Sequence, residues 1–260
     1  MKSAASPMFI RSSAGRVIKL KDRNTAMLKQ ELILRNPLRY LGFEREDVLA
    51  PGEFGAVLAH AGVGKTALLV QLALNGMLRS RNILHVSLID PVQKVNLWYG
   101  ELFHHLADRY EAPQIKRLWD SILPHRFIMT FRVDSFSVPK LDERLNDLTE
   151  QGIFKPDMMI IDGLHCNASL RPAMEALKTL AVKNGLPVWF TVHTHRHEQP
   201  EDDGLPASFS PLVDLFDLVL ELRTEHADIH ITPLKGALTG APAAADLLLD
   251  PSTMLIKDRA

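Results

Sequence analysis

The feature of this sequence that most constrains its fold is a repeated alternation between short apolar runs and longer amphipathic stretches. The apolar runs predict strands at residues 54–59, 83–88, 126–133, 157–162 and 188–192. The stretches between them predict helices at residues 65–78, 92–110, 141–150 and 172–184. Strands that alternate with helices in this way indicate a parallel sheet covered on both faces. We therefore expect a three-layer α/β fold.

The C-terminal part of the chain departs from this alternation. Three short runs, at residues 215–222, 229–234 and 254–257, have the composition of strands and are joined by turns instead of helices. Strands joined directly by turns pair antiparallel. We expect these runs to extend one side of the sheet as an antiparallel C-terminal edge.

Residues 1–50 differ from the rest of the chain and form a predicted N-terminal arm or helical segment, which is rich in lysine and arginine. A helical pattern runs from Thr25 to Leu34, and Asn36-Pro37 ends it. Two interpretations stay open: a solvated tail with one packing helix, or an arm that docks on a neighbouring subunit or partner. The main domain, residues 51–260, begins at the turn signal Pro51-Gly52.

The charge balance gives no support to binding of a polyanion. The chain of 260 residues has 30 basic and 31 acidic side chains and a net charge of -1, so it has no bulk attraction to nucleic acid or an anionic membrane. Cys166 is the sole cysteine, which excludes an intramolecular disulfide and favours a reducing compartment. The most apolar window, residues 54–78, is too polar for a membrane span. We expect a cytoplasmic protein.

A glycine-rich loop separates the first strand from the first helix of the predicted main domain. Residues 59–66 match the phosphate-loop pattern, except that Ala59 stands where the first glycine is usual. Gly62 and Gly64 allow the backbone to turn its N–H groups toward phosphate oxygens, and the helix presents its N-terminus to the same anion. The residues expected to bind the phosphates are His60, Ala61, Gly62, Val63, Gly64, Lys65, Thr66 and Ala67.

The end of this loop predicts a site for ATP with Mg²⁺. Lys65 would contact the β- and γ-phosphates, and the Thr66 hydroxyl would be a ligand of the metal. Such a site needs a carboxylate on a neighbouring strand to hold the water shell of Mg²⁺, and Asp162 ends an apolar run of the required kind. The alternative is a strand-to-helix turn without a ligand, with Asp162 capping the turn after its strand.

Several segments, in order along the chain, resemble those of one family. They are Pro51-Gly52-Glu53-Phe54, Gly62 to Leu69, His85 to Asp90, Ile160 to Leu164, Asp217 to Leu222, and Pro233 to Gly236. From about Asn36 to Lys257 the chain is similar to the RecA-like ATPases, especially the branch containing KaiC, RadA and the DnaB-type helicases. The resemblance implies a RecA-like P-loop core that binds and hydrolyses ATP, in a homo-oligomer with its sites at subunit interfaces.

The catalytic residues that the resemblance implies are incomplete. In these relatives a glutamate after the second core strand polarises the attacking water. Here Ile89 stands at that position, and Asp90 follows one residue later. Asp90 is the candidate base, although its side chain is one methylene shorter than that of glutamate. Gly163 directly after Asp162 leaves the alternative position of a catalytic glutamate empty.

Two further residues are implied by their positions. Lys235 resembles a family lysine that reaches the γ-phosphate in a neighbouring subunit, although the arginine usual two residues later is Ala237 here. The alternative for Lys235 is a solvated lysine at a strand end. His193 follows the strand that the resemblance assigns to sensing the γ-phosphate, which makes it the candidate sensor. If that strand continues, His193, His195 and His197 share one side and could instead bind a transition metal.

The acidic loop at residues 198–210 bears on the choice of function. Its carboxylates would repel the phosphates of DNA, which argues against a helicase, and it is a poor substitute for the arginine-rich lid of a small-molecule kinase. We expect a slow oligomeric ATPase that couples Mg-ATP binding and hydrolysis to a conformational change. A nucleotide-binding regulatory module without hydrolysis is the alternative that Ile89 motivates, and a small-molecule kinase ranks last.

Overall fold

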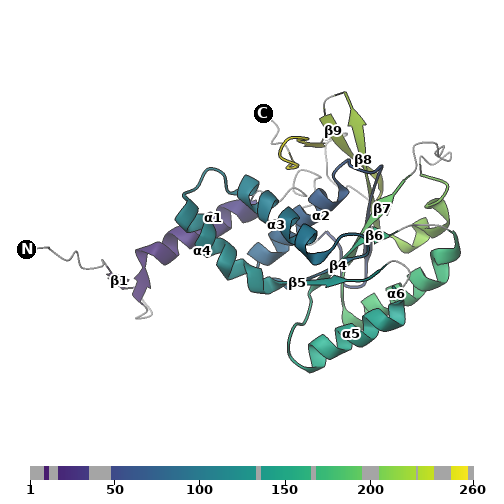
Figure 1. Cartoon of the computed structure of the whole chain (residues 1–260), viewed down its shortest axis with the longest axis horizontal. Helices are drawn as coiled ribbons and strands as arrows, with labels where there is room; N and C mark the ends of the chain where they lie inside the picture. Colours follow the sequence, from purple (N-terminus) through teal and green to yellow (C-terminus); the bar gives the residue numbers. More distant parts are fainter. Residues whose placement is uncertain are drawn as a thin grey trace, which may run out of the picture.

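The structure of the chain is a computed structural model in which eight strands form one mixed sheet. It describes residues 9–11, 17–34, 48–132, 136–164, 168–194, 205–226, 228–236 and 247–256. Within these residues the strand order is β10-β9-β8-β3-β7-β6-β4-β5, and helices lie against the sheet (Figure 1). The prediction of an α/β fold with a mostly parallel sheet is confirmed.

Among the described strands, the central part of the sheet is parallel and one side is antiparallel. The parallel strands are β3 (Phe54–Ala59), β4 (Ile83–Ser87), β5 (Arg126–Thr130), β6 (Met158–Leu164), β7 (Val188–His193) and β8 (Leu218–Glu225). β9 (Asp228–Lys235) and β10 (Leu247–Leu249) add antiparallel pairs next to β8. Every residue of β3 and β4 is buried, as expected of strands covered on both faces.

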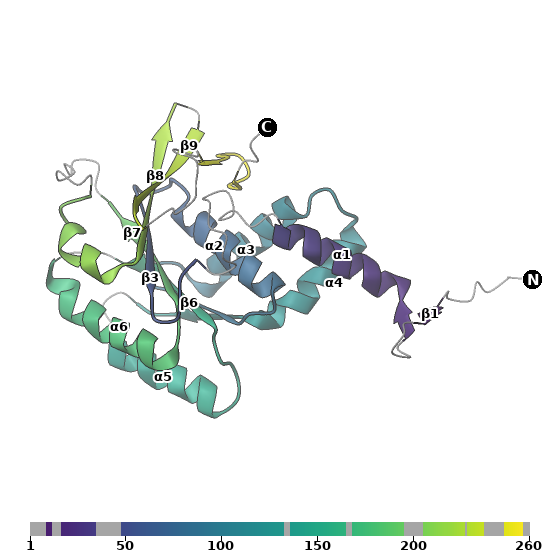
Figure 2. The same ribbon diagram turned by 180° about the vertical axis from the view of Figure 1, so that it is seen from behind.

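Helices cover both faces of this sheet (Figures 1 and 2). One face is covered by α2 (Lys65–Leu78), α3 (Val92–Leu106) and α4 (Ala112–Ile122), with α1 (Leu20–Leu34) against α2 and α4. The other face is covered by α5 (Val138–Glu150), α6 (Arg171–Asn184) and the 3-10 helix η5 (Ser210–Leu215). Because strand side chains alternate, Val57 joins the core under α2 while Ala56 and Leu58 join the opposite core.

The helix predicted at residues 92–110 is shorter than expected, and a second helix follows it. α3 ends at Leu106, and α4 then begins at Ala112 with Pro113 in its first turn. A proline is favoured there because the first N–H groups of a helix have no partner inside the helix. The sequence signal for this start was therefore present, although the prediction did not use it. The 3-10 helix η2 (Leu123–His125) connects α4 to β5.

The C-terminal strand predicted at residues 254–257 is wrong. Residues 251–253 form a turn, and only Ile256 pairs with a strand residue, Leu249. Lys257 lies outside the described residues. The strand that does form here is β10, which is too short to show a periodicity in the sequence and takes its hydrogen bonds from β9.

The N-terminal segment contains more regular structure than the sequence predicts. α1 begins at Leu20, before the predicted start at Thr25, and ends at Leu34 as predicted. Ahead of it, β1 (Phe9–Arg11) and β2 (Val17–Lys19) pair antiparallel as a separate two-stranded sheet. Another short element among the described residues is the 3-10 helix η4 (Ala168–Leu170), which leads into α6.

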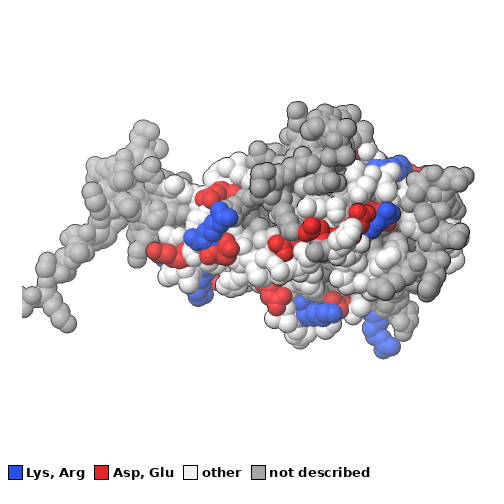
Figure 3. Space-filling model, turned by 90° about the horizontal axis from the view of Figure 1, so that it is seen from above, with Lys and Arg blue, Asp and Glu red and all other residues white. Residues whose placement is uncertain are grey.

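The described surface carries charges of both signs. On the face in Figure 3, acidic and basic side chains alternate, and the described atoms form no continuous basic patch there. Among the described helices, none combines the length with the apolar character that crossing a membrane requires.

Candidate phosphate-binding site

The loop between β3 and α2 has the backbone conformation that its glycines permit. Gly62 has a φ of 80° and Gly64 a φ of 108°, both in the left-handed region that favours glycine. Ala59 is not among the described residues with positive φ, so the alanine at the first pattern position causes no such strain. Gly64 is the N-cap of α2, and no side chain caps the helix. The helix therefore presents N–H groups that an anion can bind.

The C-terminal segment packs against this loop. A Cβ atom added to Gly64 would lie 2.8 Å from Leu249 Cδ2 and 3.3 Å from Met254 Sδ, so a side chain here would displace the C-terminal segment in addition to straining the backbone. Gln71, buried on α2, donates to the Met254 carbonyl at 2.7 Å and accepts from the Ile256 N–H at 3.2 Å. A buried glutamine inside an apolar helix is the sequence signal that could have revealed this support.

Lys65 folds back onto its own loop. Its Nζ donates to the carbonyls of Ala59 at 2.7 Å and His60 at 2.8 Å. Burial lowers the pKa of Lys65 to about 8, and the nearby Asp162 carboxylate only partly opposes this. To contact a bound phosphate, the amine would exchange these neutral carbonyls for anionic oxygens.

Thr66 and Asp162 meet across the sheet, although they are distant in sequence. Thr66 Oγ1 donates to Asp162 Oδ2 at 3.0 Å and lies 3.3 Å from Oδ1. Thr191 Oγ1 donates to Asp162 Oδ1 at 2.6 Å and accepts from the Gly163 N–H at 2.7 Å. Asp162 lies on β6, which is not adjacent to β3, because β7 lies between these two strands. This differs from the adjacent strand that we expected, and Thr191 of β7 bridges the gap.

Asp162 is a buried carboxylate that stays ionised at neutral pH. Its residue is only 7% exposed. Burial raises the pKa of Asp162, but His85 and the hydroxyls of Thr191 and Thr66 together lower it by more, so this pKa lies below its usual range. An anionic oxygen beside a hydroxyl is the donor set that a hard cation prefers.

These donors fit Mg²⁺ better than a metal held by the protein alone. Among the described residues, no three His, Cys, Asp or Glu side chains gather into a group that could hold a metal ion. Mg²⁺ is usually bound through one or two protein oxygens together with waters and substrate phosphates. Thr66 and Asp162 supply that number, beside a loop in which Gly62 has no atom within 4 Å of where a Cβ would stand.

The end of β7 lies beside the loop, as expected for the candidate sensor. His193 is the last residue of β7 and pairs with Ala59, the last residue of β3. Beyond it, the Thr194 N–H donates to the Ala59 carbonyl at 3.1 Å, and His60 Nδ1 lies 2.9 Å from the Thr194 carbonyl. His195 and His197, which the alternative metal site requires, lie outside the described residues.

The candidate base forms an ion pair with a lysine in this structure. Asp90 Oδ1 accepts from Lys94 Nζ at 2.9 Å, and the two side chains form an ion pair between residues four apart in the sequence. Ile89 is 61% exposed and lies over Gly163, where an added Cβ would be 2.6 Å from Ile89 Cγ1. An apolar side chain therefore lies beside the strand end that carries Asp162, while the carboxylate of Asp90 binds a lysine.

Lys235 lies toward the side of the sheet where the parallel strands begin, which we call the amino edge. The loop lies where these strands end, at the carboxyl edge. Lys235 pairs with Val219, and Val219 pairs with Ala56 near the start of β3. That register leaves it about 10 Å from Ala59 along the strand direction, because each residue advances a strand by about 3.3 Å. Its Nζ donates to the Val213 carbonyl at 2.8 Å. Within one chain the structure therefore does not bring Lys235 to the loop.

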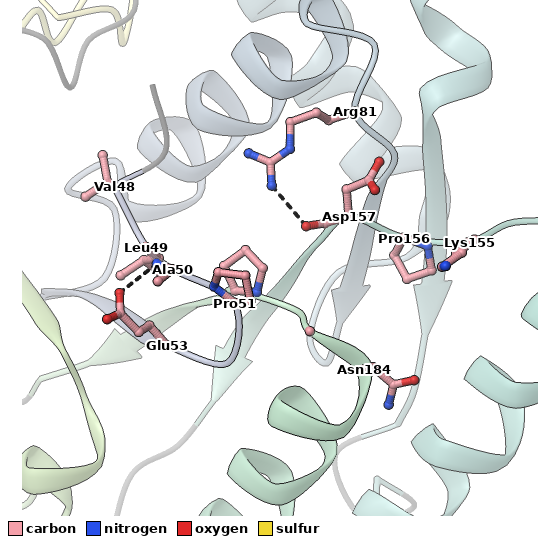
Figure 4. Close-up of a pocket in the computed structure, with 12 residues that line it drawn as sticks. Val48, Leu49, Ala50, Pro51, Glu53, Arg81, Lys155, Pro156, Asp157 and Asn184 are labelled. Atoms are coloured by element: carbon pink, nitrogen blue, oxygen red, sulfur yellow. Dashed lines mark hydrogen bonds between the residues drawn. The ribbon is translucent and has the colours of Figure 1, made fainter. Parts of the chain in front are cut away.

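A cavity of about 770 Å³ also lies at the amino edge (Figure 4). Its walls come from residues that precede strands: Pro51 before β3, Arg81 before β4, Lys155 before β6 and Asn184 before β7. Arg81 Nη2 donates to the Asp157 carbonyl at 3.0 Å, as drawn in the figure. The cavity is separate from the β3–α2 loop, which follows the other end of β3.

No protein-family model matches the chain, and no curated protein matches it significantly. What can be said of its function therefore rests on the residues of the site.

Proposed function

We propose that this chain binds ATP with Mg²⁺ at the β3–α2 loop and is a RecA-like P-loop ATPase that turns ATP over slowly. The observation that carries the proposal is the contact between Thr66 and Asp162, 3.0 Å apart. These two oxygens stand beside Lys65 and two left-handed glycines at the start of α2. A loop, an amine, a hydroxyl and a carboxylate in this order are the parts of an NTP–Mg²⁺ site.

Each residue then has a distinct role. The N–H groups of residues 60–67 surround the phosphates, and Lys65 binds the β- and γ-phosphates through its ammonium group. Thr66 and Asp162 hold Mg²⁺, directly and through water, and His193 senses the γ-phosphate. Mg²⁺, when bound, would neutralise charge on the β- and γ-phosphates. Thr191 keeps the Asp162 carboxylate in place through its 2.6 Å hydrogen bond.

Hydrolysis requires a group that polarises water, and Asp90 is the proposed base. Its carboxylate is paired with Lys94, so it must leave that ion pair to act. This requirement supports a slow rate. The same observation, together with Ile89 over Gly163, favours a second candidate function: a regulatory module that binds Mg-ATP without hydrolysing it.

The proposed assembly is a homo-oligomer in which Lys235 serves the site of a neighbouring subunit. Lys235 does not reach the loop of its own chain, so a role in catalysis requires the site of another chain. A head-to-tail contact between the two edges would bring Lys235 of one subunit toward the loop of the next. The conformational change coupled to turnover would then be a change in this contact.

The two candidate functions can be separated in one experiment. The mass of the chain in solution is measured with and without Mg-ATP, and phosphate release is assayed on the same sample. Lys65→Ala serves as the control for contaminating ATPase activity. A nucleotide-dependent oligomer with phosphate release that Lys65→Ala abolishes supports the ATPase. A stable monomer that binds Mg-ATP without phosphate release supports the regulatory module, and absence of ATP binding overturns both.

The role of Asp90 has its own test. Asp90→Ala is expected to lower kcat by about 100-fold, as loss of a general base typically does. Lys94→Ala is the matched control, because it removes the partner of Asp90 and leaves the carboxylate free. We expect Lys94→Ala to keep or increase kcat in a phosphate-release assay. Unchanged turnover in Asp90→Ala would exclude Asp90 as the base.

A further inference from the structure

A fully buried histidine stands behind the candidate metal-binding carboxylate. His85 lies on β4, next to β6, and its residue is 0% exposed. Its Nδ1 is 3.1 Å from the hydroxyl of Tyr99, and its Nε2 is 3.8 Å from Asp162 Oδ2. Among the described atoms this Nε2 has no hydrogen-bond partner. Buried polar atoms without a partner are rare and call for an explanation.

The contact between Tyr99 and His85 bears on which nitrogen of His85 carries a proton. Burial raises the pKa of Tyr99 far above neutral pH, although the Arg126 guanidinium, 4.5 Å from the centre of the ring, acts in the opposite direction. The phenol therefore keeps its proton and can donate it to His85 Nδ1. When the phenol donates, Nδ1 accepts and the ring proton lies on Nε2, the nitrogen that is 3.8 Å from Asp162 Oδ2.

The opposite tautomer is unfavourable for an electrostatic reason. It would place the Nε2 lone pair 3.8 Å from an ionised carboxylate oxygen, with no donor between them. The tautomer with Nε2–H places a positive dipole toward the same oxygen. At 3.8 Å the contact is longer than a hydrogen bond, so a small movement of the carboxylate completes it.

We propose that His85 is a positioning residue for Asp162, oriented by Tyr99, and that it sets the affinity of the site for Mg²⁺. This inference rests on the proposed Mg-ATP site. When Asp162 turns toward the water shell of the metal, His85 Nε2–H binds its Oδ2 and holds the orientation. Partners that hold a ligand in this way typically change metal affinity by about 10- to 100-fold when they are removed.

Two substitutions of His85 separate positioning from packing. Glutamine places an amide N–H near the position of Nε2, whereas asparagine places its amide near Nδ1 and does not reach Asp162. Both are polar and smaller than or similar to histidine, so they perturb the core by comparable amounts. Tyr99→Phe keeps the ring and removes only the hydroxyl that orients His85.

The test is binding of ATP to the full chain as a function of Mg²⁺ concentration, followed with a fluorescent ATP analogue. A second series in EDTA reports binding to the loop and Lys65 alone. His85→Asn is expected to raise the Mg²⁺ concentration needed for half-maximal binding by about 10-fold or more. His85→Gln should stay within about 3-fold of the wild type, with Tyr99→Phe between the two. Binding in EDTA should be equal in all four proteins.

The outcomes distinguish this inference from the proposed function. If the wild type binds no ATP in either series, the proposed function is wrong and this inference is wrong with it. If the wild type binds in an Mg²⁺-dependent way but His85→Asn has the same Mg²⁺ dependence, only the inference fails. Equal losses for asparagine and glutamine, or equal losses with and without Mg²⁺, would show that His85 only packs. Thermal unfolding of each variant checks that it folds, and Tyr99→Phe decides the matter if the asparagine variant does not.

Discussion

The amino edge of the sheet, where the parallel strands begin, and the carboxyl edge, where they end, differ in what their charged side chains bind. At the amino edge, Asp217 Oδ2 accepts from the Phe54 N–H at 2.9 Å and from Lys178 Nζ at 2.7 Å. Asp157 Oδ2, also at this edge, accepts from the Asn82 N–H at 2.8 Å. Here charges tie together the starts of the strands. They are used for structure even though the large cavity lies among them.

At the carboxyl edge the polar groups are buried, have a shifted pKa or lack a hydrogen-bond partner among the described atoms. Lys65 has a lowered pKa, Asp162 is a buried anion, and His85 Nε2 has no hydrogen-bond partner among the described atoms. Groups of this kind gather at functional sites more often than in purely structural regions. The comparison shows that the cavity and the perturbed polar groups lie at different edges, and the chemistry of the side chains favours the loop as the candidate site.

The largest expected effect compares one lysine from each edge. Lys65→Ala should weaken binding of Mg-ATP to the monomeric chain by about 100-fold, since a contact with a charged group contributes up to about 3 kcal/mol. Lys235→Ala should leave that affinity within about 2-fold, because Lys235 binds a backbone carbonyl far from the loop. Isothermal titration calorimetry measures both. A larger loss for Lys235→Ala would move the nucleotide site to the amino edge.

The next effect compares a glycine from each edge. Gly64→Ala should lower the free energy of unfolding by about 3 kcal/mol, because Gly64 has a φ of 108° and a Cβ would contact Leu249. Gly152→Ala, with a φ of 65° and open space around its Cβ, should lower it by only about 1 kcal/mol. Urea unfolding gives both values. Equal losses would mean that the C-terminal segment does not support the loop.

The smallest effect is a dependence of stability on pH. The pKa of Lys65 is about 8 in the folded chain, against an ordinary value of 10.5. Between these values the unfolded chain holds a proton that the folded chain has released, so a rise in pH favours folding. Without nucleotide, stability should increase by about 1 kcal/mol from pH 8 to pH 10, after allowing for partial exposure.

Lys65→Met is the control for this pH dependence, because it removes the titrating amine and keeps a side chain of similar length. The difference in unfolding free energy between wild type and Lys65→Met isolates the contribution of Lys65 from other groups that titrate. That difference should change across the alkaline range and stay constant below about pH 7. A difference that is constant at all pH values would show that burial does not perturb this amine.

Much of the main domain could be predicted from local patterns. The strand at residues 54–59 and the helix at residues 65–78 have the predicted bounds, since an apolar run and a helical pattern meet at glycines there. The break between α3 and α4 and the strand β10 were missed. The break before α4 depends on a single proline, Pro113. β10 forms only because the backbone of β9 is available for pairing on that side.

The sequence by itself singled out the glycine-rich loop with Lys65 and Thr66, because these residue types stand at a fixed spacing, and it singled out Asp162 because that residue ends an apolar run. Only the tertiary structure decided their partners. It placed Thr191 and His85 against Asp162, turned Asp90 toward Lys94, and laid Ile89 over Gly163. The physical reason is that sheet order and register bring together side chains from β4, β6 and β7. No local pattern encodes which strands become neighbours.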